Sequence, residues 1–393
     1  MSATTGTSIA AAPRSFQDGV DALRRGMLDA ADAAFAECLR HAPGHPPARL
    51  GVAMAMAARG RLPAACDQLR AVLADAPGFA AGARTLADWL RADAPAEAGL
   101  WYTRCARIDP SDVGAIGGAL LLAVRLQREG AVAPAAPAAP FAPAPALTSV
   151  VVCSIRPQML ARARHSLADA FGGAAWELVH VDDARSLCDG WNRGLARARG
   201  EVVVFCHDDI ALACDRLGER LADALARHDV VGVAGSTRLA GPSWAWAGAP
   251  HAHGWVAHAR DGALLVGAYA LDGPEVPAIE SLDGVFLAMR RATAAAIGFD
   301  ADACDGWHLY DTDFCWRARR AGLRLAVRCD LGLVHWSHGG FGPDWARAAR
   351  RFLERAGLPE RPMAPMPGAA VAAPSIDALP AIHGWLAHWV AAA

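Results

Sequence analysis

The chain has 393 residues, of which 54% are hydrophobic and 20% are charged, so a disordered protein is excluded and two or three globular domains are expected. Its formal net charge of −2 offers no basic surface of the kind that nucleic acids require. No stretch reaches the ~18 uninterrupted apolar residues of a membrane span. We therefore expect neither nucleic-acid partners nor a membrane span.

The 10 cysteines are scattered along the chain and form no Cys-x-x-Cys pair, which argues against a zinc ribbon or a disulfide framework. Several of them lie inside apolar patterns, as small core residues do. The amino terminus has no basic region followed by an apolar core, the mark of a secretory signal. A reducing cytoplasm fits best, with the protein in solution or peripheral to the inner face of a membrane.

Residues 12–130 are rich in Ala, Leu and Arg, and their apolar positions follow a helical period. Prolines that end helices recur at intervals of 34 and 33 residues, at Pro43, Pro77 and Pro110. Bulky residues recur in step with them, at Phe35, Leu69 and Tyr102. The pattern resembles three tetratricopeptide repeats followed by a capping helix, which implies an all-α solenoid that binds a protein partner. An ordinary Ala-rich helical bundle is the alternative.

After a Pro/Ala linker at 131–147, strands and helices alternate. Strands are predicted over 148–154, 177–181 and 202–206, with helices over 158–170 and 186–199 between them. This order predicts an α/β domain with a mostly parallel sheet and right-handed crossovers. No Gly-x-Gly-x-x-Gly and no Walker motif is present, so a dinucleotide or P-loop site is disfavoured.

The third predicted strand, 202–206, is followed directly by His207, Asp208 and Asp209. The carboxyl ends of parallel strands face the ligand crevice of an open α/β sheet, and carboxylates there can hold a divalent cation. On their own, two adjacent aspartates serve equally well to cap a turn or the next helix. The neighbouring motifs must therefore decide between the two interpretations.

Four segments in order, at 150–156, 179–186, 189–195 and 203–210, resemble family 2 glycosyltransferases of the GT-A fold, a Rossmann-like architecture. In that family the third strand ends in an Asp-x-Asp-type motif whose last Asp binds the metal on a nucleotide-sugar diphosphate. The resemblance implies that Asp209 binds Mn²⁺ or Mg²⁺, that His207 occupies the first motif position, and that Asp208 lies next to the donor.

The same resemblance implies the rest of the donor site. Ser154, Arg156 and Asp182 match positions that embrace the nucleoside, and Asn192 matches an Asn that lies near the diphosphate. Each has a structural alternative: Asn192 could satisfy backbone groups, and Asp182 could belong to a turn.

Residues 306–322 resemble the family's Glu-Asp-x-Asp-hydrophobic-Cys-x-Arg motif, with Tyr310 in place of the usual Glu. Asp311 then matches the catalytic base, which takes the proton from the acceptor hydroxyl in an inverting transfer. His335, after a later β-rich stretch, matches a His that completes the metal or phosphate site. Without these motifs, Asp311 would be interpreted as a helix cap and His335 as a hydrogen-bonded structural residue.

We therefore expect a repeat domain at 12–130, a linker at 131–147, a GT-A domain at 148–357, and a Pro/Ala-rich tail with a short helix at 358–393. The expected activity is inverting transfer of a sugar from a nucleoside-diphosphate donor to a hydroxyl of a glycan or protein acceptor. A non-catalytic scaffold that binds a nucleotide sugar, with repeats that recruit a partner, is one alternative. A nucleotidyltransferase is the other.

Overall fold

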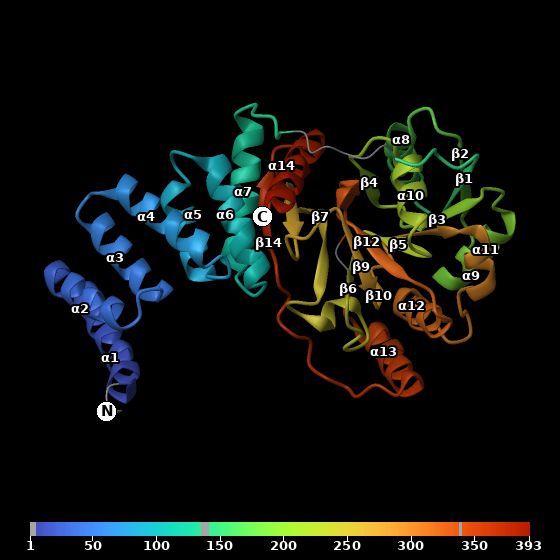
Figure 1. Ribbon diagram of the computed structural model, residues 1–393. Helices are drawn as coiled ribbons and strands as arrows, with labels where there is room; N and C mark the ends of the chain where they lie inside the picture. The colour runs from blue at the N-terminus through green and yellow to red at the C-terminus, as the bar shows by residue number, and fades with distance from the viewer. Residues whose placement is uncertain (1–4, 135–140, 338–339) are drawn as a thin grey trace. The chain divides into compact units, whose positions relative to one another are not determined.

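A computed structural model describes residues 5–134, 141–337 and 340–393. Contacts between Cα atoms divide the chain into two compact units, one reaching to Ala115 together with Ala393, the other Ile116–Ala392. Within the described residues, no helix combines the length and the apolar character needed to cross a membrane. Figure 1 labels the elements of both units.

The first unit is all-helical. It contains α1 (Thr5–Arg24), α2 (Leu28–His41), α3 (Pro46–Ala58), α4 (Leu62–Asp75), α5 (Ala80–Leu90), α6 (Pro95–Ile108) and the start of α7 (Val113–Arg128). Gly26 and Gly60 have positive φ angles in the turns before α2 and α4, where other residues would be strained. The bulky residues that recur in the sequence, Phe35, Leu69 and Tyr102, are buried. The expected all-α region ahead of an α/β domain is thus confirmed.

The second unit is built on a mixed sheet with the strand order β2-β1-β3-β11-β5-β12-β9. Its strands are β1 (Thr148–Cys153), β2 (Trp176–Val181), β3 (Val202–Cys206), β5 (Val230–Gly232), β9 (Glu275–Ile279), β11 (Phe286–Arg290) and β12 (Leu325–Arg328). β2, β1 and β3 are parallel, as the βαβαβ pattern predicts, and β11 then enters antiparallel to β3. The α/β class is confirmed, and the late strand β11 makes the sheet mixed.

Helices connect these strands. They are α8 (Pro157–Phe171), α9 (Leu187–Arg197), α10 (Leu217–Leu225), α11 (Arg291–Ile297) and α12 (Tyr310–Arg320). Ser186 caps α9 by accepting a hydrogen bond from the Asp189 backbone N–H. The predicted helices over 158–170 and 186–199 correspond to α8 and α9.

A second sheet has the order β10-β6-β7-β13-β4, and β8 joins it beside β7. Its strands are β4 (Ile210–Leu212), β6 (Ala234–Ser236), β7 (Ala252–Arg260), β8 (Ala263–Ala268), β10 (Ser281–Leu282) and β13 (Leu333–His335). The apolar run 230–235 breaks at Val233, so that β5 stays in the first sheet and β6 enters the second. Pairing of β13 with β4 sets His335 opposite Ile210, one residue beyond Asp209.

The segment after residue 357 is folded rather than extended. α13 (Pro343–Ala356) precedes it, β14 (Ala369–Ala373) pairs antiparallel with β8, and α14 (Leu379–Ala392) follows. Short 3-10 turns occur at Trp244–Ala247, Cys329–Leu331 and Ile376–Ala378. The expected short helix near the carboxyl terminus lies within α14.

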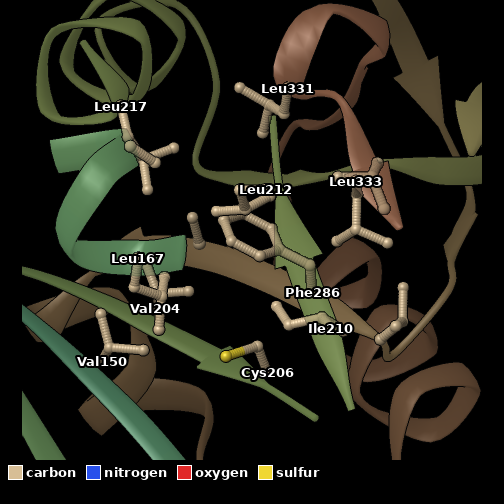
Figure 2. Close-up of a cluster of buried hydrophobic side chains, with 14 of the residues drawn as sticks. Val150, Leu167, Val204, Cys206, Ile210, Leu212, Leu217, Phe286, Leu331 and Leu333 are labelled. Atoms are coloured by element: carbon tan, nitrogen blue, oxygen red, sulfur yellow. The ribbon is translucent and has the colours of Figure 1, made fainter. Parts of the chain in front are cut away.

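The main core joins side chains from both sheets with side chains from α8 and α10, such as Leu167 and Leu217 (Figure 2). Val150, Val204 and Phe286 come from the first sheet, whereas Ile210 and Leu333 come from the second. This core anchors both chain segments that flank His207-Asp208-Asp209, because β3 ends on one side of the motif and β4 begins on the other. The motif is thereby fixed at the junction of the two sheets.

The contact division lies inside α7, upstream of the Pro/Ala segment where we expected the boundary. Ile116, Ala119 and Leu120 are buried, and all three belong to the second unit. Past the helix, the carbonyl of Ala131 accepts a hydrogen bond from Nε1 of Trp385 in α14, at 3.2 Å. Residues 135–140 of the expected linker lie outside the described residues.

Candidate active site

The His207-Asp208-Asp209 motif is held by backbone hydrogen bonds from both sides. The His207 N–H donates to the Val285 carbonyl at 3.2 Å, and the Trp336 N–H donates to the Asp209 carbonyl at 2.9 Å. Asp208 and Asp209 are buried, with 7% and 4% of their surface exposed. Buried carboxylates require hydrogen bonds or opposite charges, so the partners of each one indicate its role.

Asp209 shares a small cluster with two histidines. His335 Nε2 lies 3.5 Å from Asp209 Oδ1, and His207 Nδ1 lies 3.9 Å from the same oxygen. One ligand atom from each of the three residues lies within 4.8 Å of the others. The cluster brings together the three residues that were expected to bind metal.

The electrostatics of this cluster favour a cation. Burial opposes the charge on Asp209, but hydrogen bonds with His335 and Ser337 outweigh it and lower the pKa of the carboxyl group. Burial also opposes protonation of His335, but its bond to Asp209 and the charge of Asp283 outweigh that effect and raise its pKa. His207 differs, since burial and the neighbouring His335 lower its pKa. A carboxylate oxygen with two imidazole nitrogens fits a divalent transition metal.

Asp208 points to different partners. Ser154 Oγ donates to Asp208 Oδ2 at 2.5 Å, Arg156 Nε donates to the same oxygen at 3.1 Å, and Arg156 Nη2 binds Oδ1. The Arg156 guanidinium therefore grips the carboxylate at both oxygens, the geometry for which arginine is best suited. Asp208 is thus engaged with the end of β1 rather than with the histidine cluster.

A cavity of about 230 Å³ opens beside this network. Ser154, Arg156, Asp182 and Asp208 line it, together with Trp307. Four of the five residues expected next to the donor therefore meet in one place. The volume is below the ~300 Å³ at which ligand pockets usually begin, so it suits part of a nucleotide sugar rather than a whole one.

Asn192 is the expected donor residue that does not join them. Its Nδ2 donates to the Phe299 carbonyl at 2.7 Å, and its Oδ1 accepts from the Phe299 N–H at 3.0 Å. Both ends of the amide are therefore engaged by one backbone segment, the structural alternative noted for this residue. A role of Asn192 near a diphosphate stays a prediction.

Asp311 lies in the first turn of α12 and is half-buried. Its Oδ2 accepts from the Gly284 N–H at 3.0 Å and its Oδ1 accepts from the Thr312 N–H at 2.8 Å. Burial, aided by the charge of Asp283, raises the pKa of Asp311 to about 6 despite these hydrogen bonds. A carboxylate with such a pKa is well matched to accept a proton near neutral pH.

Asp313, two residues later, has a structural role. It is completely buried, and Arg317 Nε donates to it at 2.8 Å while Arg355 binds its other oxygen. Arg355 belongs to α13, so the carboxylate ties α12 to α13. The two aspartates of the motif thus differ, because Asp311 accepts from the Gly284 and Thr312 backbone N–H groups and Asp313 ties α12 to α13.

Tyr310 connects Asp311 to the histidine cluster, and sequence reasoning noted it only as a departure from a motif. Its hydroxyl lies 2.6 Å from His207 Nε2, and its ring packs edge-on against Trp191. Trp307 and Ser337 were also missed as site residues. The one available signal for Ser337 was its position two residues after His335 at a strand end.

Residues 149–338 match the model of a glycosyltransferase-like family. The matched segment contains every predicted site residue, so we refer to it as the glycosyltransferase-like domain. The match supports a glycosyltransferase activity in general terms and leaves donor, acceptor and metal open.

Among curated proteins, the chain is 31% identical over 148 residues to "ATP synthase subunits region ORF 6" of Fuscovulum blasticum. That alignment covers 36% of this chain and 54% of the relative, so the chain spans about half the length of the relative it matches.

Solved structures with detectable similarity include one from a functional characterisation of Pseudomonas aeruginosa pilF, with 16% identity over 32% of this chain and 57% of that one, at a TM-score of 0.29. Another is a mutant O-GlcNAc transferase of Thermobaculum terrenum, with 20% identity over 47% of this chain and 40% of that one, at a TM-score of 0.28.

Proposed function

We propose that the glycosyltransferase-like domain transfers a sugar, with inversion, from a nucleoside-diphosphate donor to a hydroxyl group. One observation carries the proposal: the 2.6 Å contact between Tyr310 and His207 joins the residue that precedes Asp311 to the cluster around Asp209. A candidate base and a candidate cation site are therefore neighbours. Inverting transfer needs these two elements on either side of the reacting carbon.

Asp311 acts as the base. As the acceptor oxygen forms its bond to the anomeric carbon, its proton passes to the Asp311 carboxylate. The bond between that carbon and the diphosphate oxygen breaks, and the nucleoside diphosphate leaves with the electron pair. The raised pKa of about 6 supports this role, because the group is ionised at neutral pH and still basic enough to accept a proton.

His207, Asp209 and His335 would hold a divalent cation, Mn²⁺ or Mg²⁺. Such a cation supplies positive charge to the departing diphosphate. Asp209 contributes the anionic ligand. The raised pKa of His335 means that its imidazole tends to hold a proton next to Asp209, and a bound cation would replace that proton. The two imidazoles favour Mn²⁺ over Mg²⁺, since Mg²⁺ prefers ligands that are oxygen atoms only.

Ser154, Arg156 and Asp182 bind the nucleoside part of the donor in the cavity at the end of β1. Asp208 fixes Arg156 in place for this purpose. Asn192, which lies on α9, contributes by holding the backbone of Phe299 against that helix. The helical repeats of the first unit recruit a protein partner or present the acceptor.

A panel of nucleotide sugars, each measured by thermal shift with and without Mn²⁺, tests the donor and the metal together. We expect one nucleoside class to raise Tm only when Mn²⁺ is present, and Asp209→Ala to abolish the shift. Asp169→Ala is the matched control, because Asp169 is an exposed aspartate of α8 that pairs with the exposed His165 on the same helix.

Donor turnover completes the test. Wild-type protein that binds donor and Mn²⁺ yet turns over no donor with any acceptor would support the non-catalytic scaffold instead. Release of pyrophosphate from a nucleoside triphosphate and a sugar phosphate would support the nucleotidyltransferase. Either result overturns the proposal.

A further inference from the structure

A second cavity, of about 540 Å³, lies between the loop before α12 and the helix α13. Its volume falls within the ~300–1,000 Å³ that is usual for ligand sites. Charged and polar side chains dominate the lining, among them Asp305, His308, Asp344 and Arg351. None of these residues takes part in the donor pocket or in the histidine cluster.

Trp307 lines both this cavity and the donor pocket around Asp208. The two cavities are therefore adjacent and share Trp307 as a lining residue. Trp307 leaves 53% of its surface exposed, although burial of an indole is strongly favourable. Four residues further along the chain, in the first turn of α12, lies Asp311, the proposed base.

The charged side chains of the cavity are available to a ligand. Arg351 pairs with Asp305 and Arg347 pairs with Asp344, but all four side chains are more than half exposed. Pairs at such exposure contribute only ~0–1 kcal/mol, so exchanging them for hydrogen bonds to a ligand costs little. Positive and negative side chains are mixed, which suits a neutral ligand with many hydroxyl groups.

We propose that this cavity binds the acceptor, and that the acceptor is a saccharide. The inference rests on the proposed transferase function and narrows its acceptor from glycan or protein to glycan. A sugar ring packs its C–H face on the exposed indole of Trp307, while its hydroxyl groups bond to the mixed charges of α13 and the 305–308 loop. A lipid chain or an extended peptide would need apolar subsites, and Trp307 and Ala348 are the apolar residues that the described lining offers.

The position of the cavity places the acceptor next to the donor pocket, because Trp307 lines both. A saccharide stacked on Trp307 lies beside the donor pocket on one side and beside the loop that leads into Asp311 on the other. Its nucleophilic hydroxyl can therefore approach the anomeric carbon of a donor held by Ser154 and Arg156.

Saturation-transfer NMR on the full chain, in the presence of Mn²⁺ and the nucleoside diphosphate found by thermal shift, tests the proposal. The probes are methyl glycosides of glucose, galactose, mannose and N-acetylglucosamine. We expect at least one glycoside to bind, and Trp307→Ala and Asp344→Ala each to weaken binding at least about tenfold. Trp101→Ala is the control, because Trp101 is a half-buried tryptophan of α6 in the first unit.

Asp344 separates this inference from the proposed function, because it lines the larger cavity and not the donor pocket. Asp344→Ala should keep the wild-type thermal shift with donor and Mn²⁺ while losing the glycoside. If donor and Mn²⁺ bind but no glycoside does, or if binding survives both substitutions, the acceptor assignment is wrong and the transferase proposal stands. If donor and Mn²⁺ fail to bind at all, the transferase proposal itself fails.

Discussion

The hydroxyl group of Tyr310 lies 2.6 Å from Nε2 of His207, across 103 residues of sequence. These are the two positions at which the chain departs from the motifs of the family it resembles, with His in place of the first Asp and Tyr in place of Glu. Because the two side chains contact each other, each unusual residue is the partner of the other. An imidazole that binds a cation through Nδ1 carries its proton on Nε2, and the hydroxyl oxygen of a tyrosine can accept a hydrogen bond from that N–H.

Tyr310→Phe removes this acceptor and leaves the ring in place. We expect Mn²⁺ affinity to fall about 10–100-fold, the usual cost of losing a partner that orients a metal ligand. Titration of Mn²⁺ by isothermal calorimetry measures the change. Tyr102→Phe is the matched control, since its hydroxyl bonds to Asp88 in the first unit at 2.5 Å. Equal Mn²⁺ affinity in wild type and Tyr310→Phe would show that Tyr310 does not orient His207.

Asp311→Asn removes the proposed base without changing the size of the side chain. We expect the rate of transfer to fall about 10²–10⁴-fold, the range for loss of general base catalysis. In the wild type, the rate should also fall as the pH drops below about 6, because protonated Asp311 cannot accept a proton. Transfer rates from pH 5 to pH 8 test both points. A variant that retains wild-type turnover would exclude Asp311 as the base.

The raised pKa of Asp311 also predicts that the free energy of unfolding of the wild type falls as the pH rises, although catalysis gains from the same rise. A carboxyl group whose pKa is raised in the folded state stabilises the fold below its unfolded pKa, and this contribution is lost as the pH rises through about 6. Asp311→Asn lacks that titration. Its free energy of unfolding relative to wild type should therefore increase from pH 4 to pH 7, by up to roughly 2 kcal/mol. Urea unfolding at the two pH values measures it, and a constant difference would contradict the raised pKa.

Arg156 and Asp208 should be energetically coupled. Arg156→Ala removes both guanidinium hydrogen bonds from the buried Asp208 carboxylate and leaves it the bond from Ser154 Oγ, and we expect a loss of about 1–3 kcal/mol in the free energy of unfolding. Asp208→Asn should reduce that loss, because a neutral amide needs the guanidinium less. A double-mutant cycle by urea unfolding gives the coupling energy, and strictly additive effects would be evidence against the pairing.

Arg328 should be among the most sensitive positions for stability. It is 4% exposed and binds Asp330, with Asp223 and Glu275 at 3.3 Å. Arg328→Met leaves three carboxylates close together, and a loss of about 3–5 kcal/mol is expected by urea unfolding. Arg324→Met is the control. The pair of Arg324 with Asp229 lies at the surface, so its loss should lower the free energy of unfolding by less than about 1 kcal/mol.

Local patterns in the sequence predicted the all-helical first region, helices α8 and α9, the first three strands and the polar residues that follow β3. They could not predict pairings between distant segments. The antiparallel entry of β11 and the pairing of β13 with β4 depend on contacts across the whole domain. Asp209 and His335 meet only because of the second pairing.

For the same reason, the sequence could not assign partners within the site. Asp208 and Asp209 are adjacent in the chain, yet Asp208 bonds to Ser154 and Arg156 whereas Asp209 lies against His207 and His335, and Arg156 reaches Asp209 only at 3.9 Å. Asn192 matched a motif position, yet both of its polar atoms bind the Phe299 backbone. A motif indicates which residues are in reach of a site, and packing decides which side each one faces.

The division of the chain inside α7 has a consequence for how such proteins can be recombined. Residues 116–128 of α7 and the described ends of the Pro/Ala segment belong to the second unit. We therefore expect that a different helical array can be grafted ahead of this unit only if the splice point lies upstream of residue 116. A splice at residue 148 would strip the buried side chains of Ile116 and Leu120 from the unit that they help to fold.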